Sequence, residues 1–441
     1  MTTRLTFIAG LLAGAMAAPA AAALPEATLA AIDTRAETVE PKLIAWRRDI
    51  HQHPELGNAE HRTAALVAAH LRKLGLEVRT GVAGTGVIGV LKGGKPGPVV
   101  ALRADMDALP VAEQTGLPFA SKAKGVYQGA EVDVMHACGH DAHVAILMAA
   151  AEVLAGMRET LPGTVTFLFQ PAEETPADFK PDGVRDWGAK RMIREGALDN
   201  PKVEAIFGLH VGSGAPSGQL AWRAGPAMAG ADSFAITVKG KQTHGAMPWS
   251  GVDPIVLSAQ IVLGIQTIAS RQLNLTREPA VISIGKIAGG NRINIIPDAV
   301  TLEGTVRVYD RAMQADIRTR LKRTAESIAT SGGGGAETEV IELYRPTVND
   351  PALTARMEPV LRQVAGSNWA PAPLSSASED FSFYQEKVPG LYLSLGVTPP
   401  DKIGKAAPNH SPLFEVDESA LRQGVRALTA LAVDYLESGG K

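Results

Sequence analysis

The chain has 441 residues, of which 45% are hydrophobic, 20% charged and 5% aromatic. This length exceeds what one hydrophobic core usually organises, so we expect a globular protein of two domains. The 43 lysine and arginine residues are balanced by 46 aspartate and glutamate residues, which leaves a formal net charge of -3. A chain with this charge balance, few aromatic residues and no basic stripe is not expected to bind nucleic acid.

The first 23 residues differ in composition from the rest. Arg4 is followed by an apolar run, Leu5–Ala18, and then by Pro19 and four alanines. This is the order of a secretory signal peptide, so we predict cleavage after Ala23 and an exported protein, periplasmic or secreted. The run is too short for a permanent anchor. We find no other stretch long and apolar enough to cross a membrane, so we expect no stable membrane anchor.

Residues 24–228 alternate between helical and strand patterns. We predict helices at 24–50, 60–74 and 144–157, and strands at 77–82, 86–91, 99–104, 164–169 and 205–209. The strands at 99–104, 164–169 and 205–209 are short apolar runs of the kind found in sheets buried on both faces. This pattern predicts an α/β domain with a mixed sheet and helices on both faces.

Residues 135–143 hold the only cysteine of the chain and three of its ten histidines. Cys138 and His140 flank a glycine turn and can face one cation, because thiolate and imidazole are the usual donors for zinc-like metals. A lone cysteine is more often a small buried hydrophobic residue. So many polar groups would be costly to bury without a partner, however. We therefore predict a metal site with further ligands downstream.

Acidic residues and a histidine follow the three buried strands. Asp105 and Asp107 come after the first, Glu173 and Glu174 after the second, and the third ends at His210. Open α/β sheets carry their functional residues at the carboxyl ends of the strands, so these side chains should meet at one rim. Their convergence near the cysteine motif predicts a metal-dependent active site.

A second domain is predicted at residues 229–344, inserted into a first domain made of 24–228 and 345–441. Its elements are a strand at 233–239, a helix at 253–271, strands at 280–287 and 299–309, a helix at 311–329 and a strand at 337–343. This is the ferredoxin-like split βαβ order, an α+β arrangement of four strands with two helices on one face. The chain then returns through 349–365 and 391–395 to a final helix at 419–436.

Seven motifs together resemble those of the M20 metallopeptidase family, amidohydrolase branch (subfamily D), which includes hippurate hydrolases, N-acyl-amino-acid amidohydrolases and auxin-conjugate hydrolases. They are Asp105–Pro110, Met135–Asp141, Gln170–Glu174, Gly208–Val211, Asn294–Asp298, Ser378–Phe381 and Asn409–Ser411. The resemblance covers nearly all of the chain after the signal segment. It implies a metal-dependent amidohydrolase that cleaves N-acyl amino acids or short peptides, of the aminoacylase or carboxypeptidase type.

The resemblance also implies a set of metal ligands, which are Cys138, His140, Glu174, His210 and His410. In the family this set holds one or two divalent ions, and a thiolate, imidazoles and a carboxylate suit Zn, Mn, Co or Ni. Glu173 resembles the family's general base, and Asp107 would orient the ligands. Asp105 stands where most M20 peptidases have histidine, which leaves open whether it contacts metal.

The inserted domain contributes three further residues by the same resemblance. His244 resembles a family histidine that stabilises the oxyanion, sometimes across a dimer interface. Asn294 and Arg292 would hold the free carboxylate of the substrate. A homodimer through this lid domain is common in the family.

Two other functions compete with this interpretation. Cys138 could be a nucleophile served by His140 or His143, in which case iodoacetamide would abolish activity and a chelator would not. Alternatively, the chain could be a catalytically silent metal-binding relative. The presence of Glu173 beside Glu174 disfavours a silent protein, because a binding site alone does not need the second glutamate.

Overall fold

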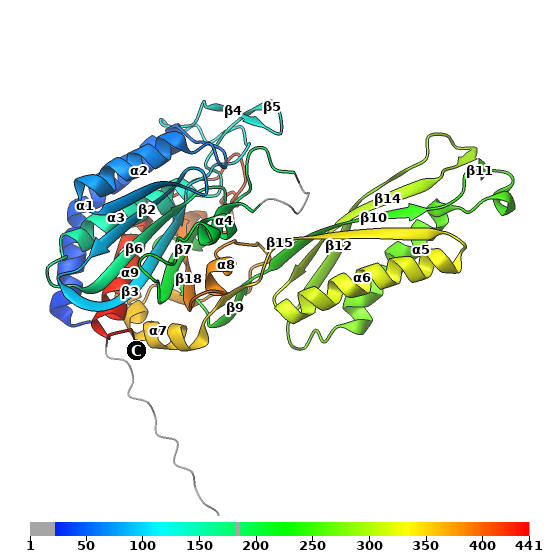
Figure 1. Cartoon of the computed structure of the whole chain (residues 1–441). Coiled ribbons are helices and arrows are strands. Elements are labelled where there is room, and N and C mark those ends of the chain that lie inside the picture. Colours follow the sequence, from blue (N-terminus) through cyan, green and yellow to red (C-terminus); the bar gives the residue numbers. More distant parts are fainter. Residues whose placement is uncertain (1–22, 181–185, 441) are drawn as a thin grey trace, which may run out of the picture.

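The computed structural model describes residues 23–180 and 186–440. The predicted signal peptide therefore lies outside the described residues, apart from Ala23. The described chain forms a large domain with a long, narrow domain extending from it (Figure 1). The two domains have separate sheets and separate hydrophobic cores.

The large domain is built on an eight-stranded sheet in the order β1-β2-β6-β3-β7-β18-β8-β17. Its strands are β1 (Glu77–Val82), β2 (Gly86–Lys92), β3 (Lys95–Asp105), β6 (Pro162–Gln170), β7 (Ala205–Pro216), β8 (Leu220–Trp222), β17 (Trp369–Pro371) and β18 (Gly390–Thr398). Strands β6, β3, β7 and β18 run parallel in the centre, and β2 is antiparallel to both of its neighbours. The predicted mixed sheet is thus confirmed.

Helices cover both faces of this sheet, as predicted. One face packs against α1 (Glu26–Gln52), α2 (His61–Lys73), α3 (His140–Ala155), α7 (Pro351–Ala365) and α9 (Leu421–Glu437), and the other against α4 (Gly188–Arg194) and α8 (Ser382–Gln385). Successive strand residues alternate between the two cores: Phe167 packs in the first and Leu168 in the second. Because both faces are covered, the central strands carry uninterrupted apolar runs.

The narrow domain is a four-stranded antiparallel sheet in the order β12-β14-β10-β15. Its elements are β10 (Gly230–Lys239), α5 (Pro254–Thr267), a π-helical turn (Ile268–Gln272), β12 (Ala280–Gly289), β14 (Ala299–Val308), α6 (Arg311–Ser331) and β15 (Gly335–Tyr344). This is the predicted split βαβ arrangement, and we call it the lid domain. Both helices pack on the sheet through a core of their own.

The stretch Pro254–Gln272 has the length and apolar composition of a membrane-crossing helix, so the prediction that no such stretch follows residue 23 is wrong. In the structure this stretch packs against the sheet of the lid domain. Leu257, Ile261 and Ile265 are buried in the lid core. The helix is apolar on its outer side as well, which is why its composition resembles that of a membrane span.

Several short elements and one strand end were not predicted. The short strands are β4 (Lys124–Tyr127), β5 (Ala130–Asp133), β9 (Gly225–Met228), β11 (Thr243–His244), β13 (Ile295–Ile296) and β16 (Thr347–Asn349). The prediction that the third buried strand ends at His210 is also wrong. Strand β7 continues to Pro216, because its pairing with β18 extends as far as the pair Thr398–Pro216. His210 therefore lies within a paired strand.

Helix α9 contains a buried acid whose replacement should change the pH dependence of stability. Burial raises the pKa of Asp434 to about 6, and Arg356 opposes this only in part. The unfolded carboxyl ionises near pH 3.9, so the folded state loses stability as pH rises through about 6. We expect Asp434→Asn to raise the melting temperature at pH 8 relative to wild type, and to raise it less at pH 4. An equal shift at both pH values in thermal unfolding would contradict this.

Candidate metal centre

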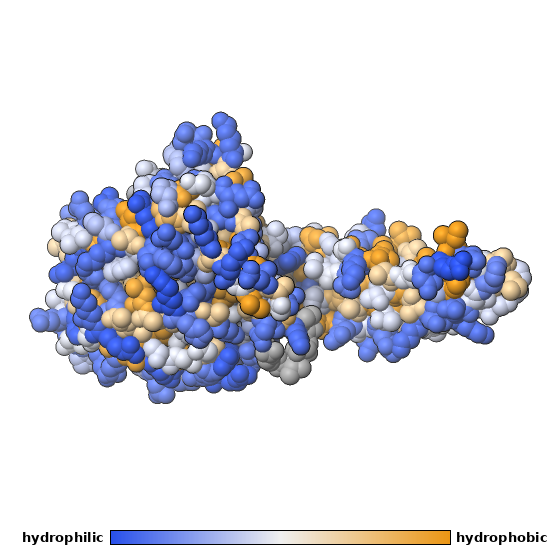
Figure 2. All heavy atoms as spheres, turned by 90° about the horizontal axis from the view of Figure 1, so that it is seen from above, coloured by the Kyte–Doolittle hydropathy of each residue, from blue (hydrophilic) through white to orange (hydrophobic). Residues whose placement is uncertain are grey.

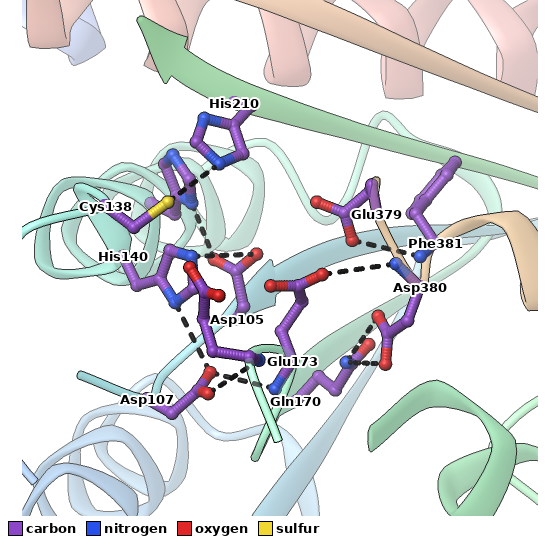
Figure 3. Close-up of polar contacts among 12 residues, drawn as sticks. Asp105, Asp107, Cys138, His140, Gln170, Glu173, His210, Glu379, Asp380 and Phe381 are labelled. Carbon is purple, nitrogen blue, oxygen red and sulfur yellow. Dashed lines mark hydrogen bonds and ion pairs between the residues drawn. The ribbon is translucent and has the colours of Figure 1, made fainter. Parts of the chain in front are cut away.

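The predicted site residues of the large domain meet at one rim of its sheet. β3 ends at Asp105 and β6 ends at Gln170, at the same edge because the two strands are parallel. Helix α3 begins at His140 beside them, and β7 delivers His210 (Figure 3). The carboxyl ends of β3 and β6 thus build part of the site, as expected for an open α/β sheet, whereas His210 comes from within β7.

The five predicted ligands lie together, although they are far apart in the sequence. Cys138 Sγ is 3.3 Å from His210 Nε2 and 3.3 Å from His410 Nε2. His410 Nε2 is in turn 2.9 Å from Glu174 Oε1. The donor atoms of His140, Glu173 and Glu174 lie within 4.8 Å of one another, and so do those of Cys138, His140 and His210.

The chemistry of these donors fits a divalent ion. Both ring nitrogens of His140 are buried and form no hydrogen bond, although Nδ1 lies 3.3 Å from Asp107 Oδ1 and Nε2 3.8 Å from Asp105 Oδ2, so a bound ion would satisfy a donor atom better than these contacts do. His210 Nδ1 lies 2.8 Å from the carbonyl oxygen of Val211 and must donate to it, so Nε2 is left unprotonated and faces the thiol. Burial lowers the pKa of His210 to about 3, which favours its neutral form, whereas Asp105 raises the pKa of His140, and Cys138 and Glu174 raise that of His410 to about 10, so these two rings would have to lose a proton to bind an ion. A thiolate, neutral imidazoles and a carboxylate are ligands for zinc-like ions.

Gly139 allows Cys138 and His140 to approach the same point. Its φ of +96° lies in the left-handed region, and it precedes α3 directly. A Cβ at this position would lie 2.3 Å from Cγ2 of Val211, next to the ligand His210. Only glycine fits both the conformation and the space.

We expect Gly139→Ala to damage the site and the fold together. The added methyl group must displace Val211 or tilt the start of α3, and the left-handed conformation adds strain of about 1–3 kcal/mol. The measurement is metal content and melting temperature of the variant. Gly129→Ala is a matched control, because Gly129 also has a positive φ but has open space around it. The control should keep its metal.

Asp107 holds the two adjacent glutamates in place. Its carboxylate accepts the backbone N–H groups of Glu173 (3.0 Å) and Glu174 (2.9 Å). Glu60, which the sequence analysis did not single out, accepts the N–H of Ala172 at 2.8 Å in the same turn. Asp107 Oδ1 is also 3.3 Å from His140 Nδ1. Asp107 therefore holds the backbone of both glutamates and lies beside His140, and the orienting role that the family resemblance implies for it stays a prediction.

Glu173 points into the site and rests on a buried network of charges. Its Oε1 accepts the N–H of Asp380 at 3.2 Å (Figure 3). Burial, and then the nearby carboxylates of Glu379, Glu174 and Asp380, raise the pKa of Glu173 well above its usual value. Arg103 forms ion pairs with both Glu379 and Asp380, each at 2.9 Å. An arginine inside a predicted apolar strand was a signal of such a network that the sequence analysis did not use.

Each carboxylate oxygen of Asp105 has a hydrogen-bond partner. It accepts Arg103 Nη1 at 2.6 Å and His143 Nδ1 at 2.6 Å. His143 Nε2 in turn accepts the backbone N–H of Val211 at 2.9 Å. Both ring nitrogens of His143 are thus occupied, so this side chain supports the site and is not free to serve as a base for Cys138. Burial also raises the pKa of the Cys138 thiol, which disfavours a nucleophilic thiolate.

A cavity of about 440 Å³ opens onto the metal centre. Arg223, which follows β8, and Arg307, on β14 of the lid domain, both line it. Tyr344, at the end of β15, lines it too and donates its hydroxyl to the carbonyl of Glu173 at 2.9 Å. These three residues belong to no recognised motif, so the sequence analysis missed them.

His244, Arg292 and Asn294 lie elsewhere. His244 is in β11, which pairs with β13 at the outer end of the lid domain (Figure 1). Arg292 and Asn294 directly precede β13, and all three side chains are exposed. None of the three lines the cavity of the same chain. The structure therefore brings together the predicted ligands, Glu173 and Asp107, and leaves these three residues apart.

Comparison with known proteins identifies the family. The sequence profile of peptidase family M20/M25/M40 matches residues 101–434. The chain belongs to this family. The M20 protein is 42% identical over 399 residues to thermostable carboxypeptidase 1 of Saccharolobus solfataricus, covering 90% of this chain and 96% of that one. It is 38% identical to N-acetyl-L-cysteine deacetylase of Bacillus subtilis over 401 residues, covering 91% and 90%.

A solved structure agrees with this assignment. The Bacillus subtilis YXEP protein, described as a dinuclear metal-binding peptidase of the M20 family, superposes with a TM-score of 0.75 at 35% identity. The match covers 91% of this chain and 99% of that one. The M20 protein is thus a metal-dependent hydrolase of amide bonds, with the lid-bearing fold of its relatives.

Proposed function

We propose that this M20 protein hydrolyses the amide bond of an N-acyl amino acid or a short peptide, with Glu173 as general base. One observation carries the proposal. Glu173 lies within reach of the clustered donors, but it remains outside the predicted ligand set and is held by the backbone of Asp380. A binding site without catalysis would not need a second buried carboxylate there.

The reaction divides between the bound ions and Glu173. One or two divalent ions (Zn, Mn, Co or Ni), held by Cys138, His140, Glu174, His210 and His410, would acidify a water molecule and polarise the amide carbonyl. Glu173 takes a proton from this water molecule while the oxygen of the water attacks the carbonyl carbon of the amide. The same carboxyl then gives the proton to the nitrogen of the departing amine, as the C–N bond breaks. Its raised pKa suits both transfers.

The substrate carboxylate has a candidate partner in the cavity itself. Arg307 lines the cavity and donates Nη1 to Ser378 Oγ at 2.6 Å. No described carboxylate pairs with it, so its guanidinium is available for a bidentate contact. We assign the substrate carboxylate to Arg307. The roles proposed for Arg292, Asn294 and His244 require that a conformational change or a second chain brings these residues to the cavity.

A second copy of this chain would supply that route. Strand β12 is at an edge of the lid sheet, and the exposed residues Val281 and Ile287 lie on it. On α5, Ile255, Val256 and Leu263 are exposed, with Leu263 71% accessible. Apolar side chains are visible along the surface of the lid domain (Figure 2). We propose a homodimer through this face, with His244 serving the partner's cavity.

Mixing two inactive variants tests the dimer. Glu173→Gln and His244→Ala chains should each be inactive alone. If the site is shared, half of the randomly formed dimers hold one complete site, so activity recovers to about a quarter of wild type. If mixing restores nothing under conditions that exchange subunits, or if light scattering shows a monomer, the shared site is excluded.

We also propose that the protein is exported. The support is the order of charged, apolar and small residues at positions 1–23. Cell fractionation with N-terminal sequencing of the product tests this, and a protein found in the cytosol with Met1 intact contradicts it.

The activity itself is tested by a substrate panel. The purified protein is loaded separately with Zn, Mn, Co or Ni and incubated with N-acyl amino acids and dipeptides, and mass spectrometry identifies the products. We expect a carboxylic acid and a free amino acid from at least one substrate class. A folded, metal-loaded protein that cleaves none of them would refute the proposed function.

A further inference from the structure

Two arginines line the cavity, and neither has a carboxylate partner among the described residues. Arg307 is on the lid domain, whereas Arg223 follows β8 of the large domain. Both donate hydrogen bonds to neutral groups: Arg307 to Ser378 Oγ, and Arg223 to the carbonyl oxygen of Ala372 at 3.3 Å. Within the described chain, the acidic residues that line the cavity are Glu173 and Glu174, and both belong to the metal centre. The rest of the cavity therefore carries uncompensated positive charge.

The guanidinium of Arg223 is partly desolvated and incompletely bonded. Its Nε is buried and has no hydrogen-bond acceptor in the described structure. The Nε atoms of Arg158 and Arg356 are likewise buried without an acceptor, but neither residue lines the cavity, and the fully buried Arg47 and Arg103 each pair with a carboxylate. A guanidinium that lines a cavity with incompletely satisfied donors and no carboxylate partner points to an acceptor on the ligand. With Nη1 on Ala372 and Nε covered by protein, Nη2 is the donor left for that acceptor.

The proposed function accounts for only one of the two arginines. The scissile amide goes to the metal centre, and the carboxylate of the amino acid goes to Arg307. Apart from Glu173 and Glu174, the described residues that line the cavity, Ala221, Ala227 and Ala372 among them, carry no carboxylate, so they offer no competing anion. A substrate with a single carboxylate would leave Arg223 unpaired in the complex.

We propose that Arg223 is a specificity-determining residue that binds a second carboxylate of the substrate. The preferred substrate class is then an N-acyl amino acid with two carboxylates, the second one in the amino-acid side chain or at the far end of the acyl group. A carboxylate can accept a charge-assisted hydrogen bond from Nη2. This inference rests on the proposed amidohydrolase function and narrows it.

The test uses substrate pairs that differ only by carboxylate and amide. One pair is N-acetylglutamate and N-acetylglutamine, and the other is N-succinylalanine and its terminal amide. We expect wild type to favour the diacid in at least one pair by about tenfold or more in kcat/KM, since a charge-assisted bond is stronger than a neutral one. Arg223→Gln should remove most of this preference, chiefly through KM, and Arg223→Lys should keep part of it. Arg356→Gln is the control, because Arg356 is equally half-buried in the large domain but lies outside the cavity. It should leave the preference unchanged.

Two results would overturn the inference. The first is a wild-type protein without preference for the diacid in either pair. The second is an Arg223→Gln variant that loses activity equally on both members of a pair, which would mean that Arg223 binds the carboxylate they share. Melting temperatures show whether a variant has folded. If Arg223→Gln has not folded, the test rests on Arg223→Lys and on the wild-type ratio of kcat/KM for the diacid to kcat/KM for its amide.

Failure of the proposed function would be recognised separately. The amide members of the pairs test hydrolysis without the second carboxylate. Calorimetric affinity of the metal-loaded Glu173→Gln protein for N-acetylglutamate and N-acetylglutamine needs no turnover. A tighter Kd for the diacid by about tenfold or more supports the role of Arg223 even if every substrate resists cleavage, and equal affinities exclude it.

Discussion

Replacing Glu173 by glutamine is expected to lower kcat by about 10²–10⁴-fold, because general acid–base catalysis contributes this much when the proton acceptor is well placed. Glutamine keeps the size of the side chain and can still accept the N–H of Asp380, which Glu173 does at 3.2 Å. The ligand set is untouched. Metal content should therefore equal that of wild type, and KM should change much less than kcat.

The control for this variant is Glu131→Gln, a change of the same chemistry on an exposed strand of the β4–β5 hairpin. It should be fully active. If the Glu173→Gln protein keeps wild-type kcat with full metal content, Glu173 is not the base. If it loses its metal as well, Glu173 is itself a ligand and the assignment of the two adjacent glutamates must be revised.

Removal of divalent ions is expected to abolish hydrolysis and to lower stability. The five predicted ligands converge from distant parts of the sequence, so without an ion their polar atoms are left packed against one another, with Cys138 Sγ 3.3 Å from both His210 Nε2 and His410 Nε2. An ion present at about 1,000 times its Kd stabilises the folded state by about 4 kcal/mol through linkage alone. A chelator should thus eliminate activity and lower the melting temperature, and re-addition of the ion should restore both.

The same experiment separates metal chemistry from a thiol nucleophile. Cys138 is only 6% exposed, and its sulfur would be held by the ion. Iodoacetamide should therefore react slowly with the metal-loaded protein and faster after chelation. Rapid inactivation of the loaded protein, together with resistance to the chelator, would favour the cysteine mechanism instead. His53→Ala changes an exposed histidine outside the site and should leave both responses unaltered.

The local pattern of the sequence was enough for most of the elements. Strand β1 was predicted with the bounds it has in the structure, and the split βαβ order of the lid domain followed from the alternation of period-2 and helical patterns. The cysteine motif and the two adjacent glutamates were also visible locally, because their residue types are unusual at such density. His410 was different: only the family resemblance connected this loop residue with the others.

Tertiary structure decided what each charged residue does. Asp105 had an open role until the structure placed Arg103 and His143 on its two oxygens. Arg223 and Arg307 belong to no motif, and only the packing of two domains around one cavity brings them together. Sequence alone therefore determined the helices, strands and chemically unusual residues, since periodicity and composition are local properties. The contacts among Cys138, His210 and His410 depend on strand order and loop placement, which bring distant residues together and which no local pattern contains.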